Sequence, residues 1–187
     1  MNTQRPSLGL IAGATAVVLA LAAGSTVAVA AASGAFRSAS VAPSGQCSAP
    51  ALPGTVVDVE LANMGGPMMM GGAIGGMMRV LTSRQRAPAG TVSLRVANVG
   101  SLVHELVVLP LAAGEQVGSR AVGSDGKVSE ADSVGEASNT CGAGAGDGID
   151  PGAIGWVTHD LPRGDYELVC NLPGHYASGM YTLLRVT

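Results

Sequence analysis

The chain contains 187 residues, which is enough for one domain of ordinary size together with a leader segment. Charged residues make up 12% of it and the formal net charge is -3, so nothing indicates a basic surface for nucleic acid. It has 28 glycines, 10 prolines and only five aromatic residues (one Trp, one Phe and three Tyr). This composition favours strands and loops over helices, around a core of Val, Leu and Ala, so we predict an all-β protein.

Residues 8–32 form an uncharged run dominated by Ala, Val, Leu and Gly. The run is about long enough to span a bilayer as a helix, and Ala28-Val29-Ala30 also offers a small-residue cleavage site. We expect residues 1–32 to be a hydrophobic signal peptide or a membrane anchor, and the sequence leaves both open. In either case we expect the rest to be exported, to the cell surface, the periplasm or the extracellular space, where disulfides are permitted.

A linker and then a single domain follow the leader. Residues 33–53 are rich in Ala, Ser, Pro and Gly and are predicted to be a flexible linker. The domain at 54–187 begins with a run at 55–61 whose apolar residues alternate with polar ones, and a second alternating run lies at 90–98. We predict strands there and at four further runs. Those runs are 104–110, 155–161, 166–170 and 181–186.

A methionine-rich segment at 64–78 holds six of the eight methionines of the chain. Thioethers among glycines can bind Cu(I) or line an apolar docking face. They can equally be a loop whose methionines pack over the end of the domain, and the sequence leaves these interpretations open.

A second unusual segment, 112–155, is rich in Gly and Ser and has seven acidic residues against two basic ones, a local charge of -5. So long a stretch without regular structure is uncommon inside a domain, and we interpret it as an insertion folded over the surface. Its acidity would suit Ca²⁺ or a basic partner, but a solvated face is the simpler interpretation.

The strongest functional pattern is the Cys170-x₄-His175-x₄-Met180 spacing between the last two predicted strands. Pro173-Gly174 predicts a turn just before the histidine. A thiolate, an imidazole and a thioether are ligands that copper favours, and two histidines, one cysteine and a weak axial methionine make the blue-copper arrangement. The pattern therefore predicts a copper site that needs one more histidine.

Two other histidines are available. His104 opens the predicted strand at 104–110, so its ring can lie at the end of a sheet where loops meet, whereas His159 lies beside Asp160 near a strand end. We predict His104 as the second histidine ligand. If Cys170 binds the metal, Cys47 and Cys141 remain as a disulfide pair that joins the linker to the inserted segment.

Cys170, His175 and Met180, with their flanking residues 164–187, resemble the C-terminal copper loop of the cupredoxins, which are the plastocyanin- and azurin-like blue copper proteins. The segment from Asn98 to Glu105 resembles the region that carries their first histidine, and the extra Gly-rich segments are most similar to sulfocyanin-like members. The resemblance spans roughly Val56 to Thr187. It implies a Greek-key β-sandwich with one type 1 copper ion bound by His104, Cys170, His175 and Met180.

The implied function is the transfer of single electrons between a redox donor and a redox acceptor protein, without catalysis. We expect no nucleic-acid partner and a monomer, and an uncleaved N-terminal helix would anchor the protein in the cytoplasmic membrane. In many members an Asn follows the first histidine and ties the two ligand loops together, but Glu105 stands here, so we expect the bonding around the ligands to differ. A copper-delivery protein that uses segment 64–78 and a metal-free interaction module are the competing hypotheses.

Overall fold

The computed structural model describes residues 47–64 and 77–187, and these residues form nine strands and one 3₁₀ helix. The elements are β1 (Thr55–Met64), β2 (Met77–Thr82), β3 (Arg86–Ala87), β4 (Gly90–Asn98), β5 (Leu106–Leu111), β6 (Gly135–Ala137), β7 (Ile154–Leu161), β8 (Gly164–Val169), η1 (Tyr176–Ser178) and β9 (Tyr181–Val186). The all-β prediction is confirmed for this part of the chain.

Several expectations fall outside the described residues. They are the signal or anchor helix at 1–32, most of the linker at 33–53, and most of the methionine-rich segment at 64–78. Within residues 47–64 and 77–187, no helix has the length and hydropathy needed to cross a membrane.

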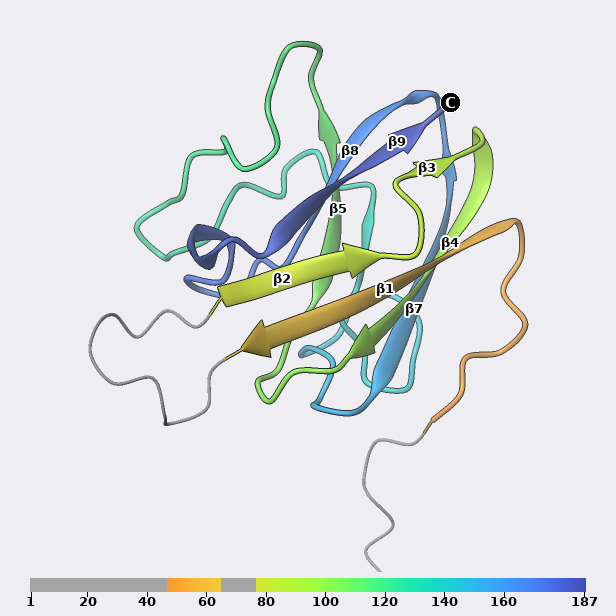
Figure 1. Cartoon of the computed structure of the whole chain (residues 1–187), viewed down its shortest axis with the longest axis horizontal. Helices are drawn as coiled ribbons and strands as arrows, with labels where there is room; N and C mark the ends of the chain where they lie inside the picture. Colours follow the sequence, from red (N-terminus) through yellow and green to blue (C-terminus); the bar gives the residue numbers. More distant parts are fainter. Residues whose placement is uncertain (1–46, 65–76) are drawn as a thin grey trace, which may run out of the picture. The chain divides into compact units, whose positions relative to one another are not determined.

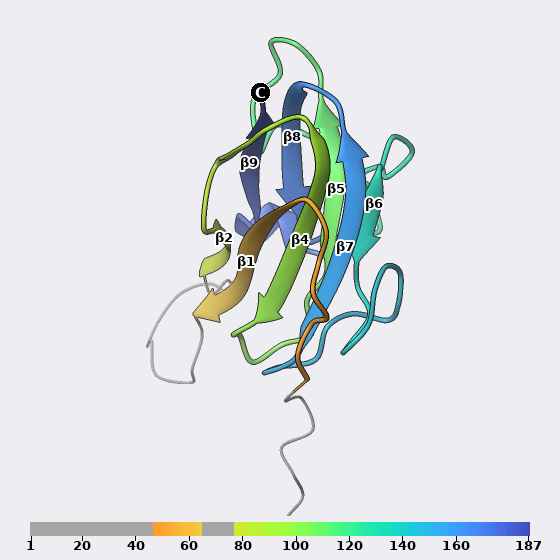
Figure 2. The same cartoon turned by 90° about the vertical axis from the view of Figure 1, so that its right-hand side faces the viewer.

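The strands form two sheets, with the orders β2-β1-β4-β7 and β3-β9-β8-β5-β6 (Figures 1 and 2). In the first sheet β1 runs parallel to β4 and antiparallel to β2, and β4 pairs antiparallel with β7. In the second sheet β8 lies between β5 and β9 and pairs antiparallel with both. The last two long strands of the chain are therefore direct neighbours, as the interpretation of 170–180 as their connecting loop requires.

Apolar residues that alternate along the strands build the core between the sheets. On β4, Val92, Leu94 and Val96 are all at most 2% exposed, and on β1 the alternating residues 57, 59 and 61 are equally buried. Because successive side chains of a strand point to opposite faces, the alternation predicted from the sequence put these residues on the inner face. This prediction is confirmed.

β5 is buried on both faces, which explains its unbroken apolar run. Leu106 and Val108 join the core between the sheets, whereas Val107 and Leu109 belong to a second cluster. That second cluster also contains Val128 from the segment after β5. Part of the acidic segment therefore packs on the outer face of the second sheet.

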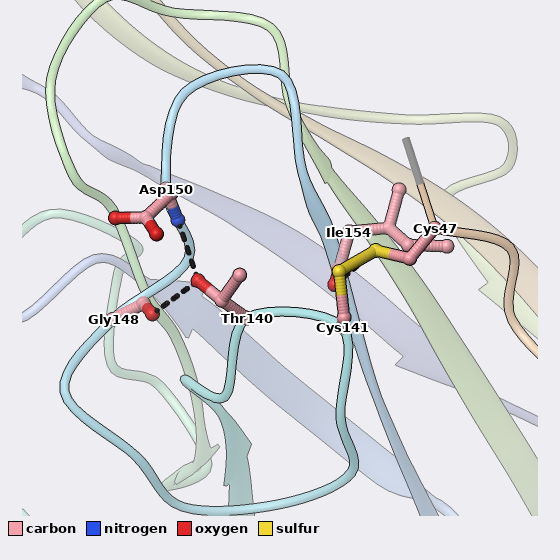
Figure 3. Close-up of a disulfide and its surroundings, with 6 residues drawn as sticks. All are labelled: Cys47, Thr140, Cys141, Gly148, Asp150 and Ile154. Atoms are coloured by element: carbon pink, nitrogen blue, oxygen red, sulfur yellow. Dashed lines mark hydrogen bonds between the residues drawn. A yellow bond between two sulfur atoms is a disulfide. The ribbon is translucent and has the colours of Figure 1, made fainter. Parts of the chain in front are cut away.

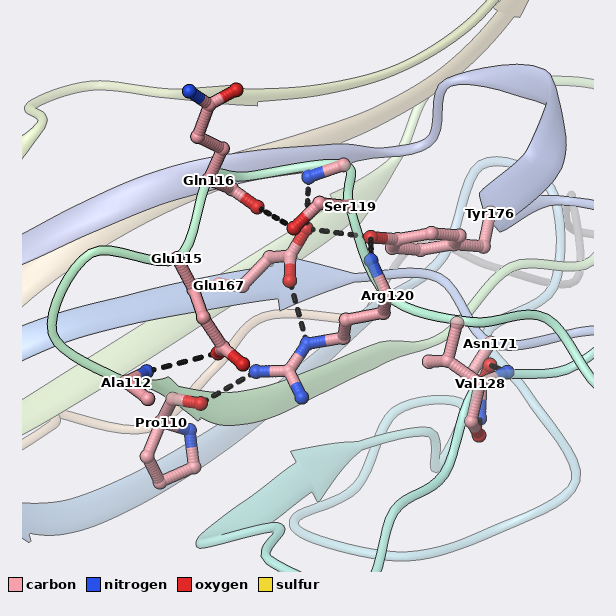
Figure 4. A network of polar contacts seen from close by, with 11 residues as sticks. Pro110, Ala112, Glu115, Gln116, Ser119, Arg120, Val128, Glu167, Asn171 and Tyr176 are labelled. Atoms are coloured by element: carbon pink, nitrogen blue, oxygen red, sulfur yellow. Dashed lines mark hydrogen bonds and ion pairs between the residues drawn. The ribbon is translucent and has the colours of Figure 1, made fainter.

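A buried carboxylate fixes this covering segment in place (Figure 4). Glu167 on β8 is fully buried and accepts hydrogen bonds from the backbone N–H of Gly118 (2.7 Å), from Arg120 Nε (2.6 Å) and from the hydroxyl of Tyr176 (3.0 Å). The Arg120 guanidinium also donates to the carbonyl of Pro110. Since Tyr176 belongs to the loop between β8 and β9, the same carboxylate links the covering segment to that loop.

The Cys47–Cys141 disulfide predicted from the sequence is present, with an S–S distance of 2.14 Å and a separation of 94 positions between the two cysteines (Figure 3). The bridge lies beside Ile154, whose carbonyl accepts the backbone N–H of Cys141 (2.8 Å). Next to it, Thr140 Oγ1 donates to the carbonyl of Gly148 (3.0 Å) and accepts the N–H of Asp150 (2.8 Å). The start of the described chain is therefore bonded covalently to the segment that precedes β7.

Candidate metal centre

The loop between β8 and β9 carries Cys170, His175 and Met180, and its own backbone determines its shape. The N–H of Cys170 donates to the carbonyl of Met180 (3.0 Å), and the N–H of Met180 donates to the carbonyl of His175 (3.2 Å). The predicted turn is confirmed, because Gly174 adopts a φ of 81° just before His175. One compact loop thus holds all three side chains.

His104 reaches the same region from a segment 66 positions before Cys170. It forms an isolated bridge with Ile149: its N–H donates to the carbonyl of Ile149 (3.2 Å) and its carbonyl accepts the N–H of Ile149 (2.6 Å). Asn98 Nδ2 donates to the carbonyls of Leu102 and Ile149, both at 2.7 Å. β5 begins only at Leu106, two residues after the predicted strand start, because residue 104 pairs with Ile149 and not with β8.

The three side chains converge. His104 Nδ1 lies 3.2 Å from His175 Nδ1, and Cys170 Sγ lies 3.3 Å from His175 Nδ1 and 3.8 Å from His104 Nδ1. Among residues 47–64 and 77–187 they form the one group of three or more His, Cys, Asp or Glu side chains whose ligand atoms approach one another within 4.8 Å. Two imidazole nitrogens and one sulfur so placed suit a borderline-soft metal ion.

Met180 lies in the same core cluster as the cysteine of this group, whereas His159 lies outside the group. Met180 is fully buried and belongs to the same core cluster as Cys170. His159 lies on β7 and is not part of the group; its ring occupies the space beside Gly135, where an added Cβ would lie 1.8 Å from Nε2. The fold therefore brings His104, and not His159, close to Cys170 and His175, in agreement with the choice made from the sequence.

Burial determines the protonation states of the two imidazoles and the thiol in the metal-free protein. Burial, together with the neighbouring His175, lowers the pKa of His104 to about 4, and burial also lowers the pKa of His175. Both imidazoles are therefore neutral at pH 7. Burial raises the pKa of Cys170 to about 11, although the N–H groups of Glu105 and Leu172 oppose this by bonding to sulfur. The thiol thus needs a metal ion in order to ionise near neutral pH.

Glu105 links the two ligand segments, although it replaces the Asn of many cupredoxins. Its backbone N–H donates to Cys170 Sγ (3.4 Å), and its carboxylate interacts with the backbone N–H of Asn171. Burial raises the pKa of the Glu105 carboxyl, whose Oε1 has no hydrogen-bond partner in the described part of the chain. The backbone N–H of Glu105 therefore links the segment that carries His104 to the loop that carries Cys170.

One polar neighbour of the site has no signal in the sequence. Asn63, near the end of β1, lies with Oδ1 3.0 Å from His104 Nε2, across 41 positions of the chain. Neither alternation nor ligand spacing singles out this residue, because its contact depends on how β1 lies beside the segment after β4.

Two sheets that bring two imidazoles and a cysteine together, with a methionine buried in the same core cluster as the cysteine, define a class of protein: the cupredoxins, which bind type 1 copper. A family model described as the sulfocyanin (SoxE) domain matches residues 61–187. The chain therefore belongs to the sulfocyanin domain family of cupredoxins, and its cofactor is copper, as one type 1 ion.

Three solved structures match most of this chain at low sequence identity. Reduced auracyanin from the photosynthetic bacterium Roseiflexus castenholzii is 18% identical, with 73% of this chain and 98% of that chain covered and a TM-score of 0.43. Rusticyanin from Thiobacillus ferrooxidans is 22% identical, with 72% and 79% covered and a TM-score of 0.44. Auracyanin B is 20% identical, with 76% and 96% covered and a TM-score of 0.45. A comparison with curated protein sequences gave no match.

Proposed function

We propose that this protein carries single electrons between a donor and an acceptor redox protein outside the cytoplasm, with His104, Cys170, His175 and Met180 as the copper ligands. The observation that carries the proposal is the convergence of His104 Nδ1, His175 Nδ1 and Cys170 Sγ within 4.8 Å. Copper, when bound, alternates between its +1 and +2 states and so accepts or releases one electron.

The surrounding backbone favours electron transfer because it keeps the ligand atoms in place. The bonds between Cys170, His175 and Met180 fix the loop, and the bridge to Ile149 fixes His104. Copper(I) and copper(II) prefer different geometries, so a site whose side chains cannot rearrange changes little when an electron arrives. Rigid positioning by hydrogen bonds around the ligands is the contribution that a protein makes to such a site.

The side chains also differ in how far they reach toward solvent. Cys170 and His104 are fully buried, whereas His175 is partly exposed. His175 is therefore the ligand through which we expect an electron to pass to a docked partner. The buried neighbours keep water away from sulfur, which protects the thiolate.

Two features support export. The uncharged run at 8–32 has the length and composition of a leader or an anchor, and the Cys47–Cys141 disulfide suits an oxidising compartment.

The three histidines provide a matched test of this proposal. Metal-free full-length protein is titrated with Cu(II), and intense visible absorption from thiolate-to-copper charge transfer is expected in the wild type and in His159→Ala. Cys170→Ser should lose this absorption, and His104→Ala and His175→Ala should lose or shift it. Wild-type protein should also give reversible one-electron voltammetry. A colourless Cu(II) form of the wild type would reject the proposal.

A further inference from the structure

The Asn63 side chain makes four polar contacts, one of them to the ring of His104. Oδ1 lies 3.0 Å from His104 Nε2 and accepts the backbone N–H groups of Ser101 (2.8 Å) and Leu102 (3.3 Å). Nδ2 donates to Ser101 Oγ (2.9 Å). Asn63 is thus the point at which β1, the segment after β4 and His104 meet.

These contacts determine which amide atom faces the imidazole. Backbone N–H groups can only donate, so the atom that receives two of them must be the amide oxygen. An amide oxygen cannot donate, and His104 Nε2 must therefore carry the proton of this hydrogen bond. A neutral imidazole holds one proton, which leaves the Nδ1 lone pair of His104 free. Nδ1 is the atom that faces Cys170 Sγ at 3.8 Å.

We propose that Asn63 is a positioning residue of the copper site: it selects the Nε2–H tautomer of His104 and fixes the ring with Nδ1 toward Cys170 and His175. The inference builds on the proposed function, because it takes His104 as a ligand. Hydrogen bonds from the second ring nitrogen commonly orient ligand histidines, and their removal typically lowers metal affinity about 10- to 100-fold.

Gly100 supplies an independent observation. A Cβ added at this position would lie 2.0 Å from Asn63 Oδ1 and 3.0 Å from His104 Nε2. The backbone of Gly100 is held close by its own N–H, which donates to Asn98 Oδ1 (2.9 Å), and by the N–H of Val99, which donates to the carbonyl of Leu61 (2.9 Å). Only glycine leaves space for the amide oxygen to reach the imidazole, so Gly100→Ala should weaken the same contact from the other side.

Metal-free protein gives the direct test, through long-range proton–nitrogen NMR correlations of the His104 ring at pH 7. The wild type should show protonated Nε2 and unprotonated Nδ1. Asn63→Leu removes the acceptor at similar volume, and both it and Gly100→Ala should show a mixture of tautomers. Asn63→Asp keeps an acceptor oxygen and should retain Nε2–H. Ser101→Ala removes only the partner of Nδ2 and serves as the control for loop structure.

Copper affinity, measured by competition with a chelator, provides the second readout. It should fall about 10- to 100-fold in Asn63→Leu and in Gly100→Ala, and stay near the wild-type value in Asn63→Asp and Ser101→Ala. Protonated Nδ1 in the wild type would overturn the inference, even if a variant failed to fold. An unchanged tautomer in folded Asn63→Leu would also overturn it. Failure of the proposed function is seen separately, as a colourless wild-type Cu(II) form.

Discussion

His104 and His175 face each other with the same ring atom: their Nδ1 atoms lie 3.2 Å apart, although 71 positions separate them in the chain. The ring centroids are 5.1 Å apart and the planes are inclined by 65°. A positive charge on one ring would therefore lie beside the other ring, in a region where His104 is fully buried. The pair consequently favours two neutral rings, and this has a measurable effect on stability.

Metal-free protein should lose stability as the pH falls from 6.5 to about 4. His104 has a folded-state pKa of about 4 and an unfolded-state value near 6.5, so the unfolded chain binds the extra proton in this window. Above pH 6.5 neutral His104 makes its full contribution to the free energy of unfolding. Protonation as the pH falls to about 4 removes at most about 3 kcal/mol of that free energy. Urea unfolding at a series of pH values measures it. His104→Gln should show a smaller slope, and equal wild-type stability at pH 7 and pH 4 would contradict the prediction.

Copper binding at pH 8 should release about one proton per ion, because the metal must displace the Cys170 proton. Burial raises the pKa of this thiol to about 11, so the thiol is protonated in metal-free protein at pH 8, while both imidazoles are already neutral. Apparent affinity should accordingly rise with pH. Calorimetry in two buffers with different ionisation enthalpies counts the protons. Cys170→Ser is the control and should release fewer, whereas no release from the wild type would argue against thiolate ligation.

Arg120→Met should destabilise the protein by about 3–5 kcal/mol, since it leaves the Glu167 carboxylate buried without its cation. Glu167 is fully buried, and its Oε2 lies 2.6 Å from Arg120 Nε. Adding Glu167→Gln to Arg120→Met should recover part of the loss, because a neutral amide is cheaper to bury. A double-mutant cycle, with free energies of unfolding measured in urea, gives the coupling free energy between Arg120 and Glu167. Strictly additive effects of the two substitutions would show that the pair contributes no mutual stabilisation.

Replacing both Cys47 and Cys141 by Ser should lower the free energy of unfolding by about 2–4 kcal/mol, because the bridge closes a long segment of chain. It spans 94 positions and lies outside the converging ligand group, so the colour of the Cu(II) form should not change. Thiol titration of unfolded, non-reduced metal-free protein checks the pairing itself. One reactive thiol is expected, from Cys170, and three would refute the bridge.

Much of the fold follows from local patterns. Alternation identified β1 and β4, because every second residue of these strands is apolar and lies on the inner face. The Cys170-x₄-His175-x₄-Met180 spacing identified the loop between β8 and β9, because its three predicted ligands lie in one short segment. His104 could be chosen from its place at the start of an apolar run. Each of these signals is contained in a few neighbouring residues.

The remaining features depend on contacts between distant segments. Glu167 alternates with Tyr166 and Leu168, a pattern typical of an outward, solvated side chain. It is buried nevertheless, because Gly118 and Arg120 cover the outer face of the second sheet. Asn63 ends a strand like many polar residues, and its bond to His104 exists only because β1 lies next to the segment that follows β4. No pattern within one segment carries this information.

The sulfur bridge also determines how the domain responds to tension. A pull exerted on the chain before Cys47 is transmitted through the bridge to Cys141, and from there into the backbone bond with Ile154 at the start of β7. β1 follows Cys47 in the chain and is relieved of that load, so the parallel ladder between β1 and β4 is not peeled open from its end. A pull on the N-terminal side of the domain would thus leave Asn63, and the imidazole it contacts, in their places.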